Sequence, residues 1–426
     1  MKYRSPGTQR KTQTLLLVSI LAVAALAVGT QWAWASDSGA PEPNYTWEGD
    51  ERLSTTSDNG AFGPDLQVAG NDDLMMAYDH RVDDDTRNPY YRRSTNEGAS
   101  WSAPAPIHTS DDDLRGVTLA FDTNNRAHAV WRSDDGLFHA AQNQWPTGSN
   151  TAHLSSGDIL APMLAIGSDN ILHLVWQESN LPSSPNIYHA YSQDGGATWS
   201  SPADLADEID LSSAPKVAVD SSGNVHVVWE ERVIDGGFQF QIHYKQGTKS
   251  GSGYSWPSSA TTVSGSAGTA RRPALVANGQ TIHLSYALQL SNEEQYPYYR
   301  RYSPGTGWSA PRDVSNDTPV SVNTNSPFYL LSTLQVCAGD VFIYYHGATE
   351  INEREQIWGT TSANNWTVVD VVTGEETRNI VPVLACIGGN LHLGYERIVV
   401  AEENHQIYHN VSNNENTLFL PLITRG

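Results

Sequence analysis

The 426-residue sequence is poor in cysteine and in basic residues. Two cysteines, Cys337 and Cys386, are too few for a fold held together by several disulfides. Lysine and arginine number 25 against 47 aspartates and glutamates, which gives a formal net charge of −22. A nucleic-acid binder must neutralise phosphates with clustered Lys and Arg, so we expect no nucleic-acid partner.

Long apolar runs are also missing, except for one near the N-terminus. Four basic residues precede an apolar run from Leu15 to Val28, and Ala33-Trp34-Ala35 follows it. This order is typical of a secretory signal, and the run is shorter than the roughly 20 residues of a spanning helix. We therefore expect residues 1–35 to be the signal peptide of an exported bacterial protein, secreted or held at the cell surface. Retention of the segment as an anchor is the alternative, and we expect no membrane insertion once it is removed.

The sequence lacks a convincing amphipathic helix and shows an internal repeat instead. Each unit contains short β-branched or aromatic runs separated by Gly, Asn, Asp and Ser turns, which is strand chemistry. First strands begin at intervals of about 45 to 58 residues, near Pro64, Val117, Pro162, Pro215, Pro273, Pro327 and Pro382. The pattern predicts an all-β chain with one β-propeller of about seven four-stranded blades over residues 45–412, with six blades as the fallback. A linker over residues 36–44 and a tail over 413–426 complete the domain prediction.

The last repeat unit lacks a clear fourth strand. Tyr45-Thr46-Trp47 and Arg52-Leu53-Ser54 resemble the segments that precede other first strands, so we expect both termini to share one blade. Cys337 and Cys386 occupy similar places in adjacent units. The sequence leaves open whether they form a disulfide or remain buried thiols.

Several units carry a loop of the form Ser-x-Asp-x-Gly-x-Thr-Trp. Ser192 to Trp199 match it fully and Ser94 to Trp101 match it nearly, while Ser303 to Trp308 and the region of Trp366 are eroded copies. These loops resemble the Asp boxes, or BNR repeats, of sialidase-like β-propellers. The resemblance implies a glycan or glycoconjugate as partner and exo-sialidase-type glycoside hydrolysis as a candidate activity. Sialidases usually have six blades and an Arg-Ile-Pro motif, whereas the first blade here opens with Phe62-Gly63-Pro64.

Charged residues follow the second strands, on the rim opposite the Asp boxes. Arginine forks bind carboxylates and neighbouring acids transfer protons, so this rim is the candidate site. The candidate substrate-binding residues are Arg81, Arg132, Arg232, Arg271 and Arg397. The candidate catalytic residues are Asp79 as acid, with Glu230 or Glu231 activating Tyr345 or Tyr395. The alternative is that these charged side chains are solvated or paired with one another.

Three other functions fit the same sequence. They are a glycan-binding propeller without catalysis, a surface adhesion module, and a polysaccharide lyase with His80 or His346 as base. We expect a monomer without cofactor or metal. One histidine per blade in a His-x-x-Trp or His-x-x-Tyr strand is a packing repeat, not a metal site; these histidines are His128, His173, His226, His283 and His392.

Overall fold

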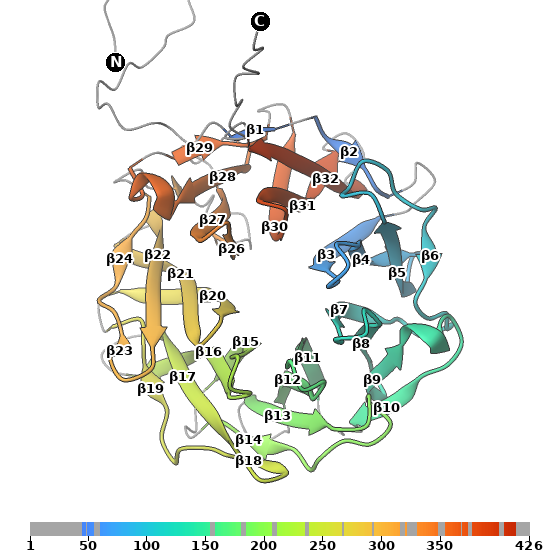
Figure 1. The fold of residues 1–426 in the computed structure, drawn as a ribbon, viewed down its shortest axis with the longest axis horizontal. Coiled ribbons are helices and arrows are strands. Elements are labelled where there is room, and N and C mark those ends of the chain that lie inside the picture. Colours follow the sequence, from blue (N-terminus) through green and yellow to red (C-terminus); the bar gives the residue numbers. More distant parts are fainter. Residues whose placement is uncertain are drawn as a thin grey trace, which may run out of the picture. The chain divides into compact units, whose positions relative to one another are not determined.

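The computed structural model describes residues 45–47, 49–54, 60–153, 158–179, 185–206, 211–234, 238–265, 268–291, 294–315, 320–321, 330–347, 354–367, 369–373, 377–399 and 404–414. These residues form seven antiparallel sheets arranged in a ring, which confirms the seven-bladed propeller (Figure 1). The expected signal peptide and linker, and the tail beyond Asn414, lie outside the described residues. No helix in the described ranges is long and apolar enough to cross a membrane.

The first four blades follow the chain without interruption. Blade 1 contains β3 (Ala61–Val68), β4 (Leu74–Arg81), β5 (Arg87–Ser94) and β6 (Ala105–Pro106). Blade 2 contains β7 (Arg115–Phe121), β8 (Ala127–Ser133), β9 (Gly136–Ala141) and β10 (Asn150–His153). Blade 3 contains β11 (Asp158–Ile166), β12 (Leu172–Ser179), β13 (Asn186–Ser192) and β14 (Ala203–Asp204). Blade 4 contains β15 (Ser212–Val219), β16 (Val225–Ile234), β17 (Phe238–Ser250), β18 (Gly253–Ser255) and β19 (Thr261–Thr262).

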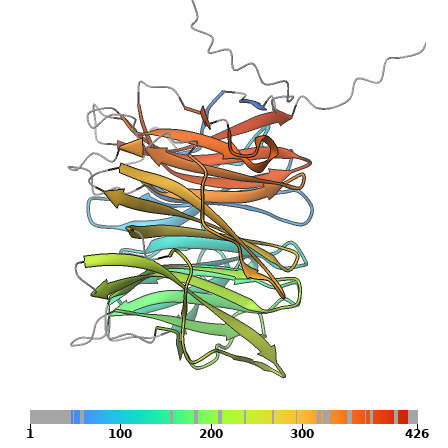
Figure 2. The same cartoon turned by 90° about the vertical axis from the view of Figure 1, so that its left-hand side faces the viewer.

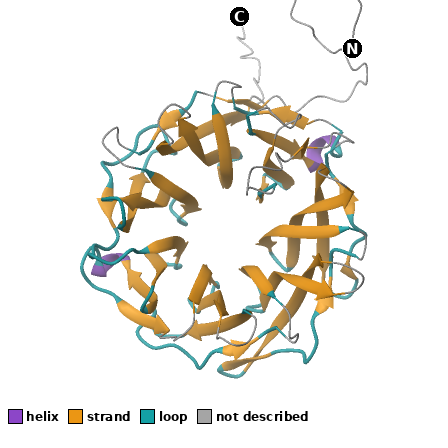
Figure 3. Cartoon of the chain, turned by 180° about the vertical axis from the view of Figure 1, so that it is seen from behind, coloured by secondary structure: helices purple, strands orange, loops and turns teal. Residues whose placement is uncertain are grey.

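The last three blades complete the ring. Blade 5 contains β20 (Thr269–Asn278), β21 (Thr281–Ser291), β22 (Glu294–Ser303), β23 (Gly307–Trp308), β24 (Arg312–Asp313) and β25 (Val320–Ser321). Blade 6 contains β26 (Ser332–Cys337), β27 (Asp340–Gly347), β28 (Gln356–Thr361) and β29 (Val369–Val371). Blade 7 contains β30 (Arg378–Ile387), β31 (Asn390–Val399) and β32 (Asn404–Asn414), joined by β1 (Tyr45–Trp47) and β2 (Glu51–Arg52). The described helices are two short 3₁₀ turns, η1 (Gln142–Gln144) and η2 (Ser362–Asn364) (Figure 3).

Six of the seven innermost strands contain a β-bulge near their start. At each bulge one residue takes a positive φ, and a Pro or Val follows it; these residues are Gly63, Gly116, Ala161, Ala214, Arg272 and Val381. A β-branched residue rarely adopts this conformation, so the surrounding structure must hold Val381 there. Blade 6 differs. Its β26 begins at Ser332, and Pro327, the expected start, lies outside the described residues.

The sheets stack face to face around the ring, with apolar clusters between them (Figure 2). A tryptophan from each blade packs against an aromatic ring of the preceding blade, with ring centroids 4.9 to 5.8 Å apart. Most of these rings come from the third strand. The pairs are Trp145–Tyr91, Trp199–His139, Trp256–His189, Trp308–Tyr244, Trp366–Tyr299, Trp47–Tyr344 and Trp101–His409. This contact therefore forms the repeated joint between blades.

In blade 6 the aromatic ring of this contact comes from a different strand. Its third-strand position is Gly359, and the ring comes from Tyr344 on the second strand, directly opposite in the sheet. A Cβ on Gly359 would lie 2.5 Å from Cε1 of Tyr344. The glycine is therefore required by the large ring beside it.

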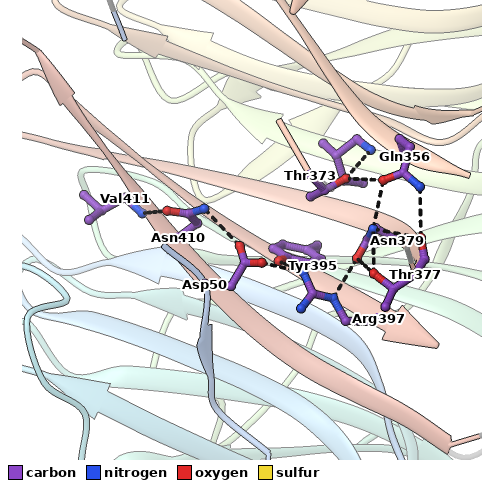
Figure 4. Close-up of polar contacts among 10 residues, drawn as sticks. Asp50, Gln356, Thr373, Thr377, Asn379, Tyr395, Arg397, Asn410 and Val411 are labelled. Atoms are coloured by element: carbon purple, nitrogen blue, oxygen red, sulfur yellow. Dashed lines mark hydrogen bonds and ion pairs between the residues drawn. The ribbon is translucent and has the colours of Figure 1, made fainter. Parts of the chain in front are cut away.

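Both termini contribute to blade 7, as the repeat predicts. β1 and β2 pair antiparallel with β32, and Leu53 N–H donates to the carbonyl of Ile407 at 2.8 Å. Asp50 accepts hydrogen bonds from Arg397 Nη2 at 2.5 Å and from Asn410 Nδ2 at 3.0 Å (Figure 4). Cys337 and Cys386 form a disulfide between the innermost strands of blades 6 and 7, which settles the alternative that the sequence left open.

Candidate functional site

The two best Ser-x-Asp loops are held by hydrogen bonds within themselves. Asp194 accepts from the N–H and hydroxyl of Thr198, at 2.9 and 2.6 Å, and Asn96 accepts from Ser100 N–H at 3.0 Å. Both loops lie between a third and a fourth strand, at the end of the blade opposite the ends of the second strands. These contacts give the loops a structural role and leave the opposite rim as the candidate site.

Acidic residues at the ends of second strands fasten one blade to the next. Asp79 accepts hydrogen bonds from the backbone N–H groups of Gly116 at 2.7 Å and Val117 at 3.1 Å, both at the bulge of blade 2. Glu230 accepts from Arg272 N–H at 2.7 Å, and Glu396 accepts from Gly63 N–H at 3.1 Å. The bulges therefore turn amides toward the carboxylates of the preceding blade.

Four arginines gather on this rim where blades 1 and 2 meet. Arg87 makes a bidentate contact with Asp113, with Nε and Nη2 each 2.9 Å from a carboxylate oxygen, and Arg115 Nε lies 2.7 Å from the same carboxylate. Arg81 is the cross-strand partner of Arg87, and Arg132 is the cross-strand partner of Arg115. We call these four residues, with Asp79 and Asp113, the arginine cluster.

Two members of the arginine cluster make no hydrogen bond or ion pair with their guanidinium groups to any residue that the structure describes. These are Arg132, which is half-buried, and Arg81, which stacks on the ring of Phe62 with its Cζ 5.0 Å from the centroid. Like charges directly opposite one another in a sheet are unfavourable, and the ion pairs of Arg115 with Asp113 and Asp134 offset this repulsion between Arg115 and Arg132.

Burial and charge shift the pKa values of the arginine cluster. Burial raises the pKa of Asp79 to about 6, against its amide hydrogen bonds and the charges of Arg87 and Arg132. Burial, and then the charge of Arg115, lowers the pKa of Arg132. Burial alone would raise the pKa of Asp113, but its bonds to Arg87 and the charges of Arg87 and Arg115 lower it overall. Asp113 is therefore ionised beside Arg87 and Arg115, whereas Asp79 titrates near pH 6.

The candidate residues of blade 4 form a second group with Arg271 of blade 5. Arg271 Nε lies 3.0 Å from Glu230 Oε2, and the guanidinium stacks on Phe240 at 4.1 Å. Glu231 accepts from Ser212 Oγ at 2.7 Å and from Trp229 Nε1 at 2.8 Å. Arg232 ends the same run on β16, opposite Phe240. Glu230 and Glu231 thus hold strands and blades in place.

The remaining candidates lie in blades 6 and 7. Tyr345 is fully buried, and no described residue hydrogen-bonds its hydroxyl. Tyr395 accepts from Arg397 Nη2 at 2.7 Å, and Arg397 Nε donates to Asn379 at 2.9 Å, within the network that holds Asp50 (Figure 4). No contact among the described residues joins either tyrosine to Glu230 or Glu231, so the structure does not bring the expected Tyr–Glu pair together. The catalytic roles assigned from sequence stay predictions.

Sequence reasoning found three members of the arginine cluster and missed the contact that organises it. The signal by which these three were selected is their position at the end of a second strand. They are Asp79 and Arg81 on β4 and Arg132 on β8. Arg87 and Asp113 lie 26 residues apart and meet only because the first-to-second-blade connection returns to β5. Asp113 ends a run of three aspartates, and nothing in that run indicates which of them would accept a bidentate contact from an arginine.

Comparison with solved structures finds proteins of similar fold, at low sequence identity. No family model and no curated protein matches the chain. Similar solved structures include a protein of unknown function from Dyadobacter fermentans, 9% identical over 88% of this chain and 100% of that one, with a TM-score of 0.55. An ulvan lyase, solved bound to -[GlcA(1-4)Rha3S]-, is 11% identical over 84% of this chain and 95% of that one, with a TM-score of 0.59. A sialidase from Trypanosoma rangeli is 14% identical over 83% of this chain and 55% of that one, with a TM-score of 0.45. Carbohydrate-active propellers are thus among the structural neighbours, and at these identities the likeness concerns the fold alone.

Proposed function

We propose that this protein is directed at carbohydrate and binds an acidic saccharide at the arginine cluster. The observation that carries the proposal is Arg132, a half-buried guanidinium without an ion-pair partner among the described residues, beside Arg115 and Arg87. A carboxylate or sulfate group of a sugar would accept hydrogen bonds from two N–H groups of the Arg132 guanidinium, in the plane of that group. The ulvan lyase of similar fold, solved with a saccharide that contains GlcA, supports a sugar as the carrier of that group.

The acidic character of the whole chain does not oppose this binding at short range. The net charge of −22 acts on a ligand across a distance, where salt screens it beyond about 8 to 10 Å. At the arginine cluster the local charges are closer to balance, because four guanidiniums face Asp79 and Asp113, with Asp134 3.8 Å from Arg115 Nη2 and Asp158 acting on Arg132. An acidic group that reaches the arginine cluster therefore meets two guanidiniums, those of Arg81 and Arg132, that no described carboxylate pairs with.

Binding of D-glucuronate, N-acetylneuraminate and neutral D-glucose by calorimetry tests the proposal. We expect the acids to bind and glucose not to bind, with roughly tenfold weaker binding in Arg132→Gln because one charge-assisted contact is lost. Arg301→Gln is the matched control, since it removes one positive charge from an exposed residue at the far end of β22. Equal affinity for acids and glucose, or unchanged affinity in Arg132→Gln, contradicts the proposal.

Glycoside cleavage is the second candidate, and Asp79 is the observation that favours it. A carboxyl with a pKa of about 6, held beside Arg87 and Arg132, is protonated often enough to act as an acid near neutral pH. Release of the fluorophore from a fluorogenic sialoside by wild type, and its loss in Asp79→Asn with ligand affinity retained, would make the protein a sialidase-like hydrolase. Binding without turnover between pH 4 and 8 would instead make it a non-catalytic glycan-binding propeller.

A further inference from the structure

Arg81 is a second guanidinium of the arginine cluster without an ion pair among the described residues. Its Cζ lies 5.0 Å from the centroid of Phe62, and the ring of His405 lies 4.7 Å from the same ring. A cation–π contact of this kind uses the face of the guanidinium and leaves its N–H donors available to an anion. Arg81 thus presents a fork that no described residue occupies with a carboxylate.

Arg81 and Arg132 lie at opposite ends of a chain of contacts. Arg81 lies across the strand pair from Arg87, Asp113 links Arg87 to Arg115, and Arg115 lies across the next strand pair from Arg132. The two inner arginines share Asp113, so their charge is partly neutralised within the protein. The two outer arginines belong to different blades and make no ion pair with a described residue, although the charges of Asp79 and Asp158 act on Arg132.

We infer that the ligand is an oligosaccharide with acidic groups on at least two of its sugar residues, one group bound by Arg132 and another by Arg81. The inference rests on the proposed function and defines its substrate class. A bidentate fork is filled by one carboxylate or sulfate, so two separate forks match two acidic groups. A single terminal acidic sugar would leave the Arg81 fork empty.

The test compares D-galacturonate with its linear trimer, and uses maltotriose as the neutral trimer. For wild type we expect the acidic trimer to bind at least roughly tenfold more tightly than the monomer, because the second fork adds a charge-assisted contact. Arg81→Gln should weaken trimer binding roughly tenfold and bring the affinity for the trimer down to that for the monomer. Arg132→Gln should weaken both, and Arg301→Gln neither. Arg81 has no ion pair among the described residues, so its loss should leave the folded structure intact, which an unchanged urea midpoint verifies.

The outcomes separate this inference from the proposed function. Loss of monomer and trimer binding in Arg132→Gln, with no effect of Arg81→Gln on the trimer, overturns the two-group ligand and keeps the acidic-saccharide site. Wild-type affinity in Arg132→Gln, or no binding of either acid by wild type at low salt, overturns both. Trimer binding equal to that of maltotriose also overturns the inference, because charge would then contribute nothing.

Discussion

Buried histidines recur at one position of the second strand in five blades, and each ring contacts a ring of the third strand. His173 Nδ1 lies 3.1 Å from His189 Nε2, and His283 Nδ1 lies 2.8 Å from the hydroxyl of Tyr299. Burial lowers the pKa of His173 to about 3 and that of His283 to about 4. His173 and His283 are therefore neutral in the folded protein at any pH above about 5, and all five histidines act as packing rings with a hydrogen bond.

We predict that stability falls as the pH drops from 7 to 5. The folded pKa values lie below the ordinary 6.5 of histidine, so the unfolded chain takes up these protons first and is stabilised by them. At pH 5 His173 and His283 should each lower the free energy of unfolding by about 2 kcal/mol relative to a pH well above 6.5. Urea unfolding at pH 7 and pH 5 measures the difference.

His283→Asn provides the matched comparison, because asparagine does not titrate in this range. The difference in unfolding free energy between pH 7 and 5 should shrink by about 2 kcal/mol in this variant, whatever its stability at pH 7. A wild type that is equally stable at both pH values, or a variant with the full wild-type difference, would show that these rings do not control the acid response.

At the scale of the strands, Gly359 and Tyr344 show how one blade departs from the repeat while keeping its joint. We predict that Gly359→Ala lowers the free energy of unfolding by about 1 to 3 kcal/mol, because the new methyl group overlaps the Tyr344 ring. Gly359 has no positive φ, so the cost is one of space and not of backbone strain.

A double-mutant cycle isolates that cost. In Gly359→Ala with Tyr344→Leu, the smaller side chain leaves room for the methyl group, and the combined loss measured by urea unfolding should be less than the sum of the two single losses. Additive losses would mean that Tyr344 does not fill the space above Gly359.

Much of this strand architecture could be predicted from sequence, because the repeat fixes which residue types recur. The second strands with His-x-x-Trp or His-x-x-Tyr lie where the pattern places them, and the unit that lacks a fourth strand is completed by Tyr45–Trp47. β26 begins at Ser332 and lacks the bulge, followed by Pro or Val, of the other six innermost strands, and its expected start at Pro327 lies outside the described residues. The arginine cluster was found only in part, because it depends on cross-strand register and on a linker carboxylate that no local pattern reveals.

At the scale of the whole ring, the N-terminal strands cover the outer edge of blade 7. We predict that a chain beginning at residue 61 has a lower melting temperature and associates as its concentration rises, because β32 then exposes an unpaired edge. It also loses the contacts of Asp50 with Arg397 and Asn410. Calorimetry and light scattering measure the two effects.

A chain beginning at residue 42 is the control, since it keeps β1, β2 and Asp50. It should match the full chain in both measurements. A chain beginning at residue 61 that is as stable and as monomeric as this control would show that the N-terminal strands are dispensable for the ring.

The closing contact also sets the order in which the ring is completed during synthesis. Asp50 and its partner Asn410 are 360 residues apart in the chain, and translation at about 5 to 20 residues per second separates their emergence by roughly 20 to 70 seconds. Blades 1 to 6 consist of contiguous segments, so they have all their strands well before the seventh. Blade 7 is thus the latest to assemble, and its high contact order makes it the step at which a newly made chain is most exposed to mispairing with another.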